Sequence, residues 1–281
     1  MFPRALKPVM PGVRLSQQGC QPDEETRFLP AGNNLKIRLD KLLFDRGMTS
    51  SRERAQALIL AGKVLVNEQK VEKSGRSVEP DASIRILGED LKYVSRGGLK
   101  LERALGYWKM DVTGKTCLDV GTSTGGFTDC LLQHGAARVI GVDTGYGQID
   151  ARLRRDTRVR LLEKTNARYL TREQLGESVD LIVMDVSFIS AALILPAVVA
   201  AGFPSNERRG KKIVVLVKPQ FEGGREQVGK GGVVRDPAVR AAAVEKVRGV
   251  MRNLGCVQSD VTESPILGAE GNHEFLLLGV F

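Results

Sequence analysis

The sequence predicts a two-domain α/β protein, in which a parallel sheet covered by helices on both faces follows a smaller α/β module. Three observations lead to this fold class. A chain of 281 residues with 42% hydrophobic residues can hold about two domains. From residue 116 onward, short apolar runs alternate with helical patterns, as in a doubly covered sheet. The stretch LDVGTSTGGFTDCLL, residues 118–132, has the order strand, glycine turn, helix.

The composition favours an anionic macromolecular partner and no bound metal. The net charge is +9 and the pI is about 9.5, a balance that suits a polyanion but also occurs in proteins that bind none. The cysteines form no C-x-x-C pair, and the histidines show no metal-ligand spacing with them. We therefore expect reduced thiols and no metal. The residues concerned are Cys20, Cys117, Cys130, Cys256, His134 and His273.

The hydropathy pattern predicts a soluble, cytoplasmic protein without membrane contact. The longest apolar run, AALILPAVVAAGF from Ala191, is too short to span a bilayer and contains Pro196. The first residues lack the continuous apolar segment of a signal peptide. The sequence does not fix the oligomeric state, and a monomer is expected.

We divide the chain into three parts. Residues 1–34 carry scattered Pro, Gly, Gln and charges without periodicity, which predicts a poorly ordered extension. Residues 35–97 are expected to form the small module. Residues 98–281 are expected to form the larger α/β domain.

The small module is predicted to contain two helices followed by short strands. Apolar residues on one helical face predict a first helix that ends at Gly47. The motif SSRE then supplies Ser50 as an N-cap with Glu53 three residues later, and a second helix runs to Gly62. KVLVN and SIRIL have the pattern of strands.

Positive charge is in excess beside the two predicted helices. Between Lys36 and Lys73 there are nine Lys or Arg residues and five acids. Such a run is usually a solvated face, but basic residues near helix starts are well placed to contact phosphates. Because few aromatic residues accompany them, recognition of folded RNA by backbone and shape is favoured over base stacking. The candidate RNA-binding residues are Arg38, Lys41, Arg52, Arg54 and Lys63.

The stretch IRLDKLLFDRGMTSSRERAQALILAGKVLVNEQKV resembles the RNA-binding domain named after a small-subunit ribosomal protein. That domain is shared with pseudouridine synthases and a tyrosyl-tRNA synthetase. The match includes the R-L-D start, the S-R pair, A-x-x-L-I and the G-x-V-x-V-N ending. The resemblance implies that this module binds RNA.

Charged residues gather at the carboxyl ends of the strands predicted in the larger domain. These strands are CLDVG, RVIGVD, VRLLE, DLIVMD, KIVVLVKP and EFLLLGVF, which we expect to form a parallel sheet. Ligands of such sheets bind at the carboxyl ends of the strands. One acid there would be an ordinary helix cap or loop residue, whereas four charged groups at one edge predict a site. They are Asp119, Asp143, Asp185 and Lys218.

The turn after the first of these strands suits a nucleoside ligand that carries a positive charge. The dinucleotide motif G-x-G-x-x-G fails, because Ser123 stands where the second glycine is needed. Asp119 would repel a phosphate but attract the ammonium and sulfonium groups of S-adenosylmethionine. An ordinary turn of an α/β domain is the alternative. The candidate cofactor-binding residues here are Asp119, Gly121, Thr122, Ser123, Gly125, Gly126 and Phe127.

Later strand ends supply further candidates. Asp143 could accept hydrogen bonds from both ribose hydroxyls of a nucleoside, or it could be a cap. Asn166 could bind an adenine edge, although asparagine in a loop more often stabilises a turn. Asp185, which is also a candidate cofactor contact, and Lys218 should meet at the buried edge. This pair could prepare the lysine to act as a general base, or it could be a structural salt bridge.

The larger domain resembles the FtsJ-like ribose 2′-O-methyltransferases, which implies a Rossmann-like fold that binds S-adenosylmethionine. The motifs are SRGGLKL, LDVGTSTGGFTD, GVDTGYGQ, MDVSF, LVKPQFE and GNHEF. Thr122 and Thr124 replace an alanine and a proline often found in the family's turn, with the spacing unchanged. Those enzymes use a Lys-Asp-Lys-Glu tetrad, which falls here on Lys100, Asp185, Lys218 and Glu274.

Residues 37–281 together resemble the TlyA subgroup, often labelled hemolysin A, whose studied members methylate cytidine ribose in ribosomal RNA. The resemblance implies methyl transfer to cytidine 2′-OH groups of 16S and/or 23S rRNA, with rRNA or ribosomal subunits as partners. Lys218 would then take the 2′-OH proton or stabilise the oxyanion, with Asp185 tuning Lys218 and orienting the methyl group. Lys100 and Glu274 would position the acceptor ribose.

Two other functions stay open. One is an RNA-binding or ribosome-assembly protein with an inactive methyltransferase fold, which would not bind S-adenosylmethionine. The other is a cytolysin, as the hemolysin label suggests, which would need membrane-inserting segments that the sequence lacks. The glycine-rich segment from Phe221 to Pro237 reads either as a basic lid beside Lys218 or as a plain surface loop, with Asp236 and Pro237 starting the next helix.

Overall fold

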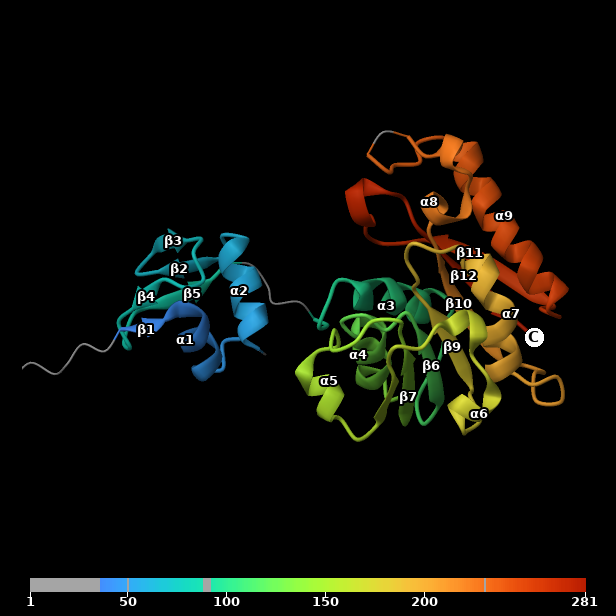
Figure 1. Ribbon diagram of the computed structural model, residues 1–281, viewed down its shortest axis with the longest axis horizontal. Helices are drawn as coiled ribbons and strands as arrows, with labels where there is room; N and C mark the ends of the chain where they lie inside the picture. Colours follow the sequence, from blue (N-terminus) through green and yellow to red (C-terminus); the bar gives the residue numbers. More distant parts are fainter. Residues whose placement is uncertain (1–35, 50, 88–91, 230) are drawn as a thin grey trace, which may run out of the picture.

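The computed structural model describes residues 36–49, 51–87, 92–229 and 231–281. The extension predicted over residues 1–34 lies outside these described residues. Figure 1 shows a small α/β module in blue and cyan, and a larger α/β domain coloured from green to red.

The small module packs two helices against short strands around one apolar core. A three-stranded antiparallel sheet has the order β3-β2-β5, and β1 pairs with β4. The predicted strands KVLVN and SIRIL are confirmed as β2 and β5. The elements are β1 (Ile37–Arg38), α1 (Leu39–Asp45), α2 (Arg52–Leu60), β2 (Val64–Val66), β3 (Gln69–Val71), β4 (Ser77–Val78) and β5 (Ile84–Ile86).

Helix α2 is capped by Ser51, so the prediction of Ser50 as its N-cap was wrong by one residue. Ser51 has extended backbone, and its Oγ accepts a hydrogen bond from the backbone N of Arg54 (3.1 Å). The third helical position is therefore Arg54 and not Glu53, which removes the predicted capping box. Ser50 itself lies outside the described residues.

A buried carboxylate, Asp40, joins β1, α1 and α2. Arg38 donates two hydrogen bonds to it (3.1 and 2.9 Å), Gln56 donates one (2.8 Å) and Arg52 donates a longer one (3.3 Å). The Asp40 side chain is fully buried. These bonds, that of Arg38 above all, hold the pKa of the Asp40 carboxyl well below its usual range, although burial acts in the opposite direction. The Asp40 carboxylate thus connects β1, α1 and α2 through its hydrogen bonds and ion pairs.

The larger domain is built on a seven-stranded sheet of order β11-β12-β10-β9-β6-β7-β8. The five strands β10, β9, β6, β7 and β8, which are neighbours in this order, pair in parallel. Strand β12 is antiparallel to both β10 and β11. The strands are β6 (Thr116–Val120), β7 (Arg138–Val142), β8 (Val159–Leu162), β9 (Leu181–Met184), β10 (Lys212–Val217), β11 (Gln258–Glu263) and β12 (Phe275–Val280).

The prediction of an all-parallel sheet was wrong at one edge. The last predicted strand, EFLLLGVF, is present as β12 but runs in the reverse direction, and β11 was not predicted. The β11 sequence QSDVTE lacks an apolar run because β11 lies at the edge of the sheet, where its residues are exposed or half-buried. The other five predicted strands are confirmed.

Helices cover both faces of this sheet (Figure 1). One apolar cluster joins α3, α4 and α5 to one face, and a second joins α6, α7 and α9 to the other. Asp236 caps α9 and Pro237 is its first residue, as predicted. The helices are α3 (Gly97–Tyr107), α4 (Gly126–Gln133), α5 (Ala151–Arg155), α6 (Arg172–Leu175), α7 (Ala191–Gly202), α8 (Pro219–Glu222) and α9 (Pro237–Asn253), with 3-10 turns η1 (Ala167–Tyr169), η2 (Arg225–Gln227) and η3 (Ala269–Gly271).

Replacing Asp40 by asparagine is expected to destabilise the small module by about 1–3 kcal/mol at neutral pH, because the amide carries no negative charge and its NH2 group cannot accept the hydrogen bonds that a carboxylate oxygen accepts. The folded pKa of Asp40 is lowered, so its contribution is fully present above the unfolded value of about 3.9 and is lost as the pH falls below it. Urea unfolding of wild type and Asp40→Asn at neutral and strongly acidic pH measures this. A difference in the free energy of unfolding that does not shrink on acidification would contradict the assignment.

Candidate functional site

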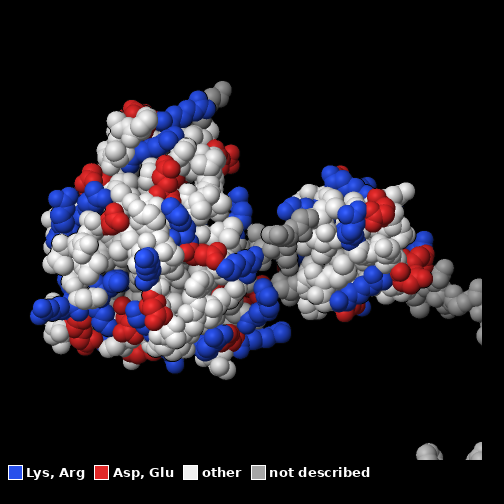
Figure 2. Space-filling view, turned by 180° about the vertical axis from the view of Figure 1, so that it is seen from behind, with Lys and Arg blue, Asp and Glu red and all other residues white. Residues whose placement is uncertain are grey.

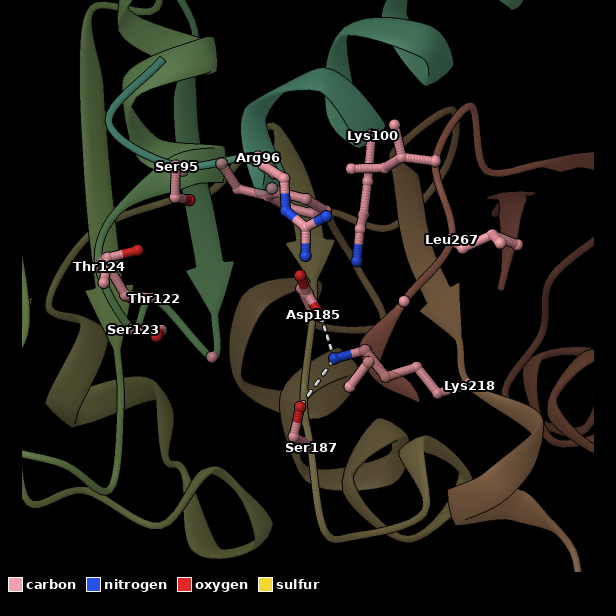
Figure 3. Close-up of a pocket in the computed structure, with 17 residues that line it drawn as sticks. Ser95, Arg96, Lys100, Thr122, Ser123, Thr124, Asp185, Ser187, Lys218 and Leu267 are labelled. Carbon is pink, nitrogen blue, oxygen red and sulfur yellow. Dashed lines mark hydrogen bonds and ion pairs between the residues drawn. The ribbon is translucent and has the colours of Figure 1, made fainter. Parts of the chain in front are cut away.

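Two cavities meet at the carboxyl edge of the parallel strands. The lysine cavity, of about 300 Å³, is lined by Lys100 and Lys218 and is drawn in Figure 3. The Asp143 cavity, of about 570 Å³, is lined by Asp143 and Asn166. They lie at the edge where the sequence predicts a site, and a ligand in one cavity can reach the other. The residues that line both are Gly121, Ser123, Asp185 and Ser187.

The turn between β6 and α4 is shaped by glycines and forms part of both cavities. Gly121 has a φ of +86°, and a Cβ there would lie 2.3 Å from the carbonyl oxygen of Asp185. Only glycine therefore lets the exits of β6 and β9 approach so closely. Gly125, with a φ of +95°, precedes α4 in the left-handed conformation. The residues of this turn that line the lysine cavity are Gly121, Thr122, Ser123, Thr124, Gly126 and Phe127.

Asp143, at the end of β7, fixes this turn and also faces its cavity. Its Oδ2 accepts a hydrogen bond from the backbone N of Ser123 (2.8 Å), and its Oδ1 accepts one from Gly145 (2.7 Å). The side chain caps loop backbone, which is close to the alternative that the sequence left open. Each carboxylate oxygen has two lone pairs, so Asp143 can still accept hydrogen bonds from a ligand.

Asn166 and Phe188 lie on the wall of the Asp143 cavity. The Oδ1 of Asn166 accepts a hydrogen bond from the backbone N of Arg168 (3.0 Å), so it caps η1 and leaves the Nδ2 group for a ligand. Phe188 is 91% exposed, has a φ of +65° and lies with its ring centroid 5.3 Å from that of Phe221. Sequence reasoning missed Phe188, because neither its exposure nor its backbone conformation can be read from MDVSF.

Lys218 and Asp185 form an ion pair in the lysine cavity. The Lys218 Nζ lies 2.6 Å from Asp185 Oδ1 and donates a hydrogen bond to Ser187 Oγ (2.8 Å), as Figure 3 shows. The two side chains are only 10% and 19% exposed. They follow β10 and β9, which are neighbouring parallel strands, so strand pairing brings them together as the sequence predicts.

Lys100 and Glu274 form a second, more deeply buried pair at 2.5 Å. Lys100 lies in the first turn of α3, and Glu274 immediately precedes β12. Because β12 is antiparallel to β10, its first residue, Phe275, pairs with Val217 at the carboxyl end of β10. Strand reversal therefore brings Glu274 to the edge that carries Lys218.

Sequence reasoning passed over Ser95 and Arg96, which also line the lysine cavity. In Figure 3 the guanidinium of Arg96 points toward Asp185. Both residues belong to the motif SRGGLKL, from which only Lys100 was selected. Arg96 could have been predicted from its spacing, because it lies four residues before Lys100 and residues four apart on a helix share one face.

Asp119 lies beneath the glycine turn, outside the lining of both cavities. It is fully buried, and its Oδ2 accepts a hydrogen bond from Thr128 Oγ1 (2.6 Å). Its Oδ1 has no hydrogen-bond partner among the described residues. Burial, reinforced by the charges of Asp185 and Asp143, raises the pKa of the Asp119 carboxyl to about 7. Because Asp119 lines neither cavity, it can act on a cationic ligand only through the electrostatic field of its charged form, and not by direct contact.

The candidate RNA-binding residues lie on the small module, where Arg38, Lys41, Arg52 and Lys63 are exposed and Arg54 is half-buried. Arg38 and Arg52 both pair with Asp40, so one buried carboxylate partly balances their charge. Lys41 pairs with Asp45 (3.1 Å). Counting charges along the sequence could not reveal this balance. Figure 2 shows that Lys and Arg side chains are also spread over the larger domain.

The described residues contain no group of three or more His, Cys, Asp or Glu placed to hold a metal ion. Cys117, Cys130 and Cys256 are buried free thiols, and burial raises the pKa of Cys117 and Cys130 to about 12. Among the helices in the described ranges, none combines the length and apolar character needed to cross a membrane.

The doubly covered sheet with its reversed strand, the glycine turn and the paired charges at the carboxyl edge together define a methyltransferase of the α/β class. The chain belongs to the FtsJ-like methyltransferase family, whose model matches residues 93–281. It also carries an S4 domain, matched over residues 37–84.

Known relatives match across both parts of the chain. The "16S/23S rRNA (cytidine-2′-O)-methyltransferase TlyA" of Mycobacterium tuberculosis is 45% identical over 243 residues, which is 86% of this chain and 89% of that protein. "Hemolysin A" of Brachyspira hyodysenteriae is 40% identical over 242 residues, 85% of this chain and 98% of that protein. A solved structure described as a "putative hemolysin" from Streptococcus thermophilus has a TM-score of 0.66 and 40% identity, covering 88% of this chain and 90% of that chain.

The raised pKa of Asp119 predicts a pH-dependent stability. Because the folded pKa lies above the unfolded value of about 3.9, Asp119 favours the folded state at low pH and costs stability as the pH rises toward 7 and beyond. Between about pH 5 and pH 7, the free energy of unfolding of wild type should fall by on the order of 2 kcal/mol relative to that of Asp119→Asn. Urea unfolding of both proteins across this range tests it, and parallel pH profiles would show that Asp119 is charged throughout.

Proposed function

We propose that this protein is an S-adenosylmethionine-dependent rRNA 2′-O-methyltransferase that modifies cytidine ribose in 16S and/or 23S rRNA. The observation that carries the proposal is the meeting of the Lys218–Asp185 and Lys100–Glu274 pairs beside a cavity suited to a nucleoside. The S4 domain and the name of the M. tuberculosis relative support rRNA as the substrate.

The glycine turn and the Asp143 cavity fit S-adenosylmethionine. Asp143 offers two acceptor oxygens to ribose hydroxyls, and Asn166 Nδ2 can donate to the base. Gly121 keeps the turn close to the exit of β9, so both line the same cavity. When bound, the cofactor supplies an electrophilic methyl group. Contacts from the turn residues predicted above complete the proposed binding site.

The lysine cavity is proposed to hold the acceptor ribose. The ribose 2′-OH is a weak nucleophile at neutral pH and must lose its proton during methyl transfer. Lys218 lines the lysine cavity and contacts Asp185 and Ser187, which line both cavities, so we assign it to this proton or to the developing oxyanion. Asp185 and Ser187 fix its Nζ. Lys100, held by Glu274, lines the same cavity and is assigned to positioning the ribose.

The remaining expectations are part of the same proposal. We propose domain limits of 35–97 and 98–281, a cytoplasmic monomer, and no membrane or metal partner. An inactive fold is disfavoured because the four charged residues form two close pairs. A cytolysin is disfavoured because the described part of the chain contains no helix that could span a membrane. Mapping 2′-O-methyl groups on rRNA treated with the pure protein tests the function, and lysis of liposomes by that protein would favour the cytolysin.

Lys218→Ala is expected to keep the fold and the affinity for S-adenosylmethionine but to lower methyl transfer to rRNA about 100-fold or more, because it removes the group that handles the 2′-OH proton. Lys218→Arg separates two roles, since a guanidinium stays protonated but can stabilise an oxyanion. Calorimetry and single-turnover methylation measure both properties. Lys212→Ala, at the opposite end of β10, is the matched control. A near-normal rate for Lys218→Ala would remove Lys218 from the mechanism.

Binding of rRNA or ribosomal subunits is expected to weaken steeply with salt, because the small module contacts phosphates. Replacing Lys41 and Lys63 by glutamine should reduce the slope of log affinity against log salt by about 2 and leave cofactor affinity intact. These lysines are better targets than Arg38 and Arg52, whose removal would leave the buried Asp40 without its two cationic partners. Exposed Lys109 on the larger domain serves as a control, and an unchanged slope in the double variant would locate the RNA surface elsewhere.

A further inference from the structure

Asn272 is a buried polar residue whose amide NH2 group and amide oxygen all take part in hydrogen bonds. Only 2% of it is exposed. Its Nδ2 donates to the carbonyl oxygens of Gly232 (2.9 Å) and Ala269 (3.1 Å), and its Oδ1 accepts from the backbone N of Val234 (3.0 Å). A buried amide that makes three such bonds holds its partners in fixed relative positions.

The partners of Asn272 come from two different segments. Gly232 and Val234 belong to the glycine-rich segment between Lys218 and α9. Ala269 belongs to the segment 266–269, which lines the lysine cavity and is called here the cavity wall. The Asn272 backbone closes the turn behind this wall, because its N donates to the Ala269 carbonyl (3.1 Å) and its carbonyl accepts from Gly268 N (2.8 Å). Asn272 therefore joins the chain that leaves Lys218 to the wall of its cavity.

The cavity wall lies directly against Glu274. A Cβ on Gly268 would come within 2.0 Å of Glu274 Oε1, so this glycine contacts the carboxylate that holds Lys100. Asn272 stands two residues before Glu274 in the sequence. The position of the wall, the Lys100–Glu274 pair and the glycine-rich segment are thus set together.

The glycine-rich segment needs such an anchor. Gly231 and Gly232 both have positive φ, and a Cβ on either would meet nothing within 4 Å, so local packing supports them poorly. Glu222 ties the start of this segment to α7 and α9 through Ser190, Ala191 and Lys246. Its later part, residues 229–234, is held by the turn between Gly229 and Val233 (3.1 Å), the burial of Val234, the Arg240 bond to the Val234 carbonyl (2.9 Å) and the bonds to Asn272. The Asn272 bonds are the ones that connect it to the cavity wall.

We infer that Asn272 is a positioning residue for the acceptor side of the site: it holds the cavity wall and the segment after Lys218 in the geometry that the acceptor ribose requires. The inference rests on the proposed function. Asn272 touches neither cavity, and its contacts all lie on the lysine-cavity side, so the affinity for S-adenosylmethionine should not depend on it.

The test compares Asn272→Ala, Asn272→Asp and the exposed control Asn253→Ala in the full chain. Asn272→Asp keeps the side-chain volume and the acceptor for Val234, but turns a carboxylate oxygen toward the two carbonyls that Nδ2 bonds. Both Asn272 variants should lower kcat for rRNA methylation about 10–100-fold, with the calorimetric affinity for S-adenosylmethionine unchanged. Hydrogen exchange of backbone amides over 231–236 and 266–272 should accelerate in both, and Asn253→Ala should match wild type.

Normal kcat in Asn272→Asp, or unchanged exchange in these two segments, would overturn the inference. Asn272→Asp decides the question if the alanine variant does not fold, because it creates no cavity. A purely space-filling role predicts a normal aspartate variant. If wild type itself transfers no methyl group to rRNA, the proposed function fails, whereas the exchange measurement still shows whether Asn272 holds the two segments together.

Discussion

The direction of β12 is the constraint on which the charged site depends. Five parallel strands bring Asp185 and Lys218 to one edge, but a sixth parallel strand would start at the opposite edge. Because β12 is antiparallel to β10, Phe275 pairs with Val217 and the strand starts at the carboxyl edge. Glu274, the residue just before the strand, therefore lies at that edge and contacts Lys100, which is 174 residues away in the sequence. Each charge of the buried Lys100–Glu274 pair compensates the other, and removing either would leave an unpaired buried charge.

A second constraint couples the two cavities. The close approach of Gly121 to the Asp185 carbonyl makes the glycine turn and the exit of β9 a single surface. Asp143 holds the same turn from the other side through Ser123. The two cavities therefore share one stretch of wall, to which the turn and the exit of β9 both contribute.

The sequence predicts those features that depend on local pattern, and it fails for those that depend on pairing or burial. The five parallel strands consist mainly of apolar residues, so their residues alone identify them, and Asp185 and Lys218 follow because parallel strands end at one edge. The reversal of β12 is decided by its partner β10, and the edge strand β11 carries no apolar run. Asp40 and Asn272 look like ordinary surface residues in the sequence, and only their burial gives them their roles. Two adjacent serines made the N-cap of α2 ambiguous by one position.

The place of β12 in the sheet also bears on how the protein is made. This strand lies between β10 and β11, yet it follows both in the chain. A nascent chain emerging from a ribosome would have β6 to β10 available early, with a gap where β12 belongs and without Glu274 to neutralise the buried Lys100. The Lys100–Glu274 pair can therefore form only after β6 to β11 have been made.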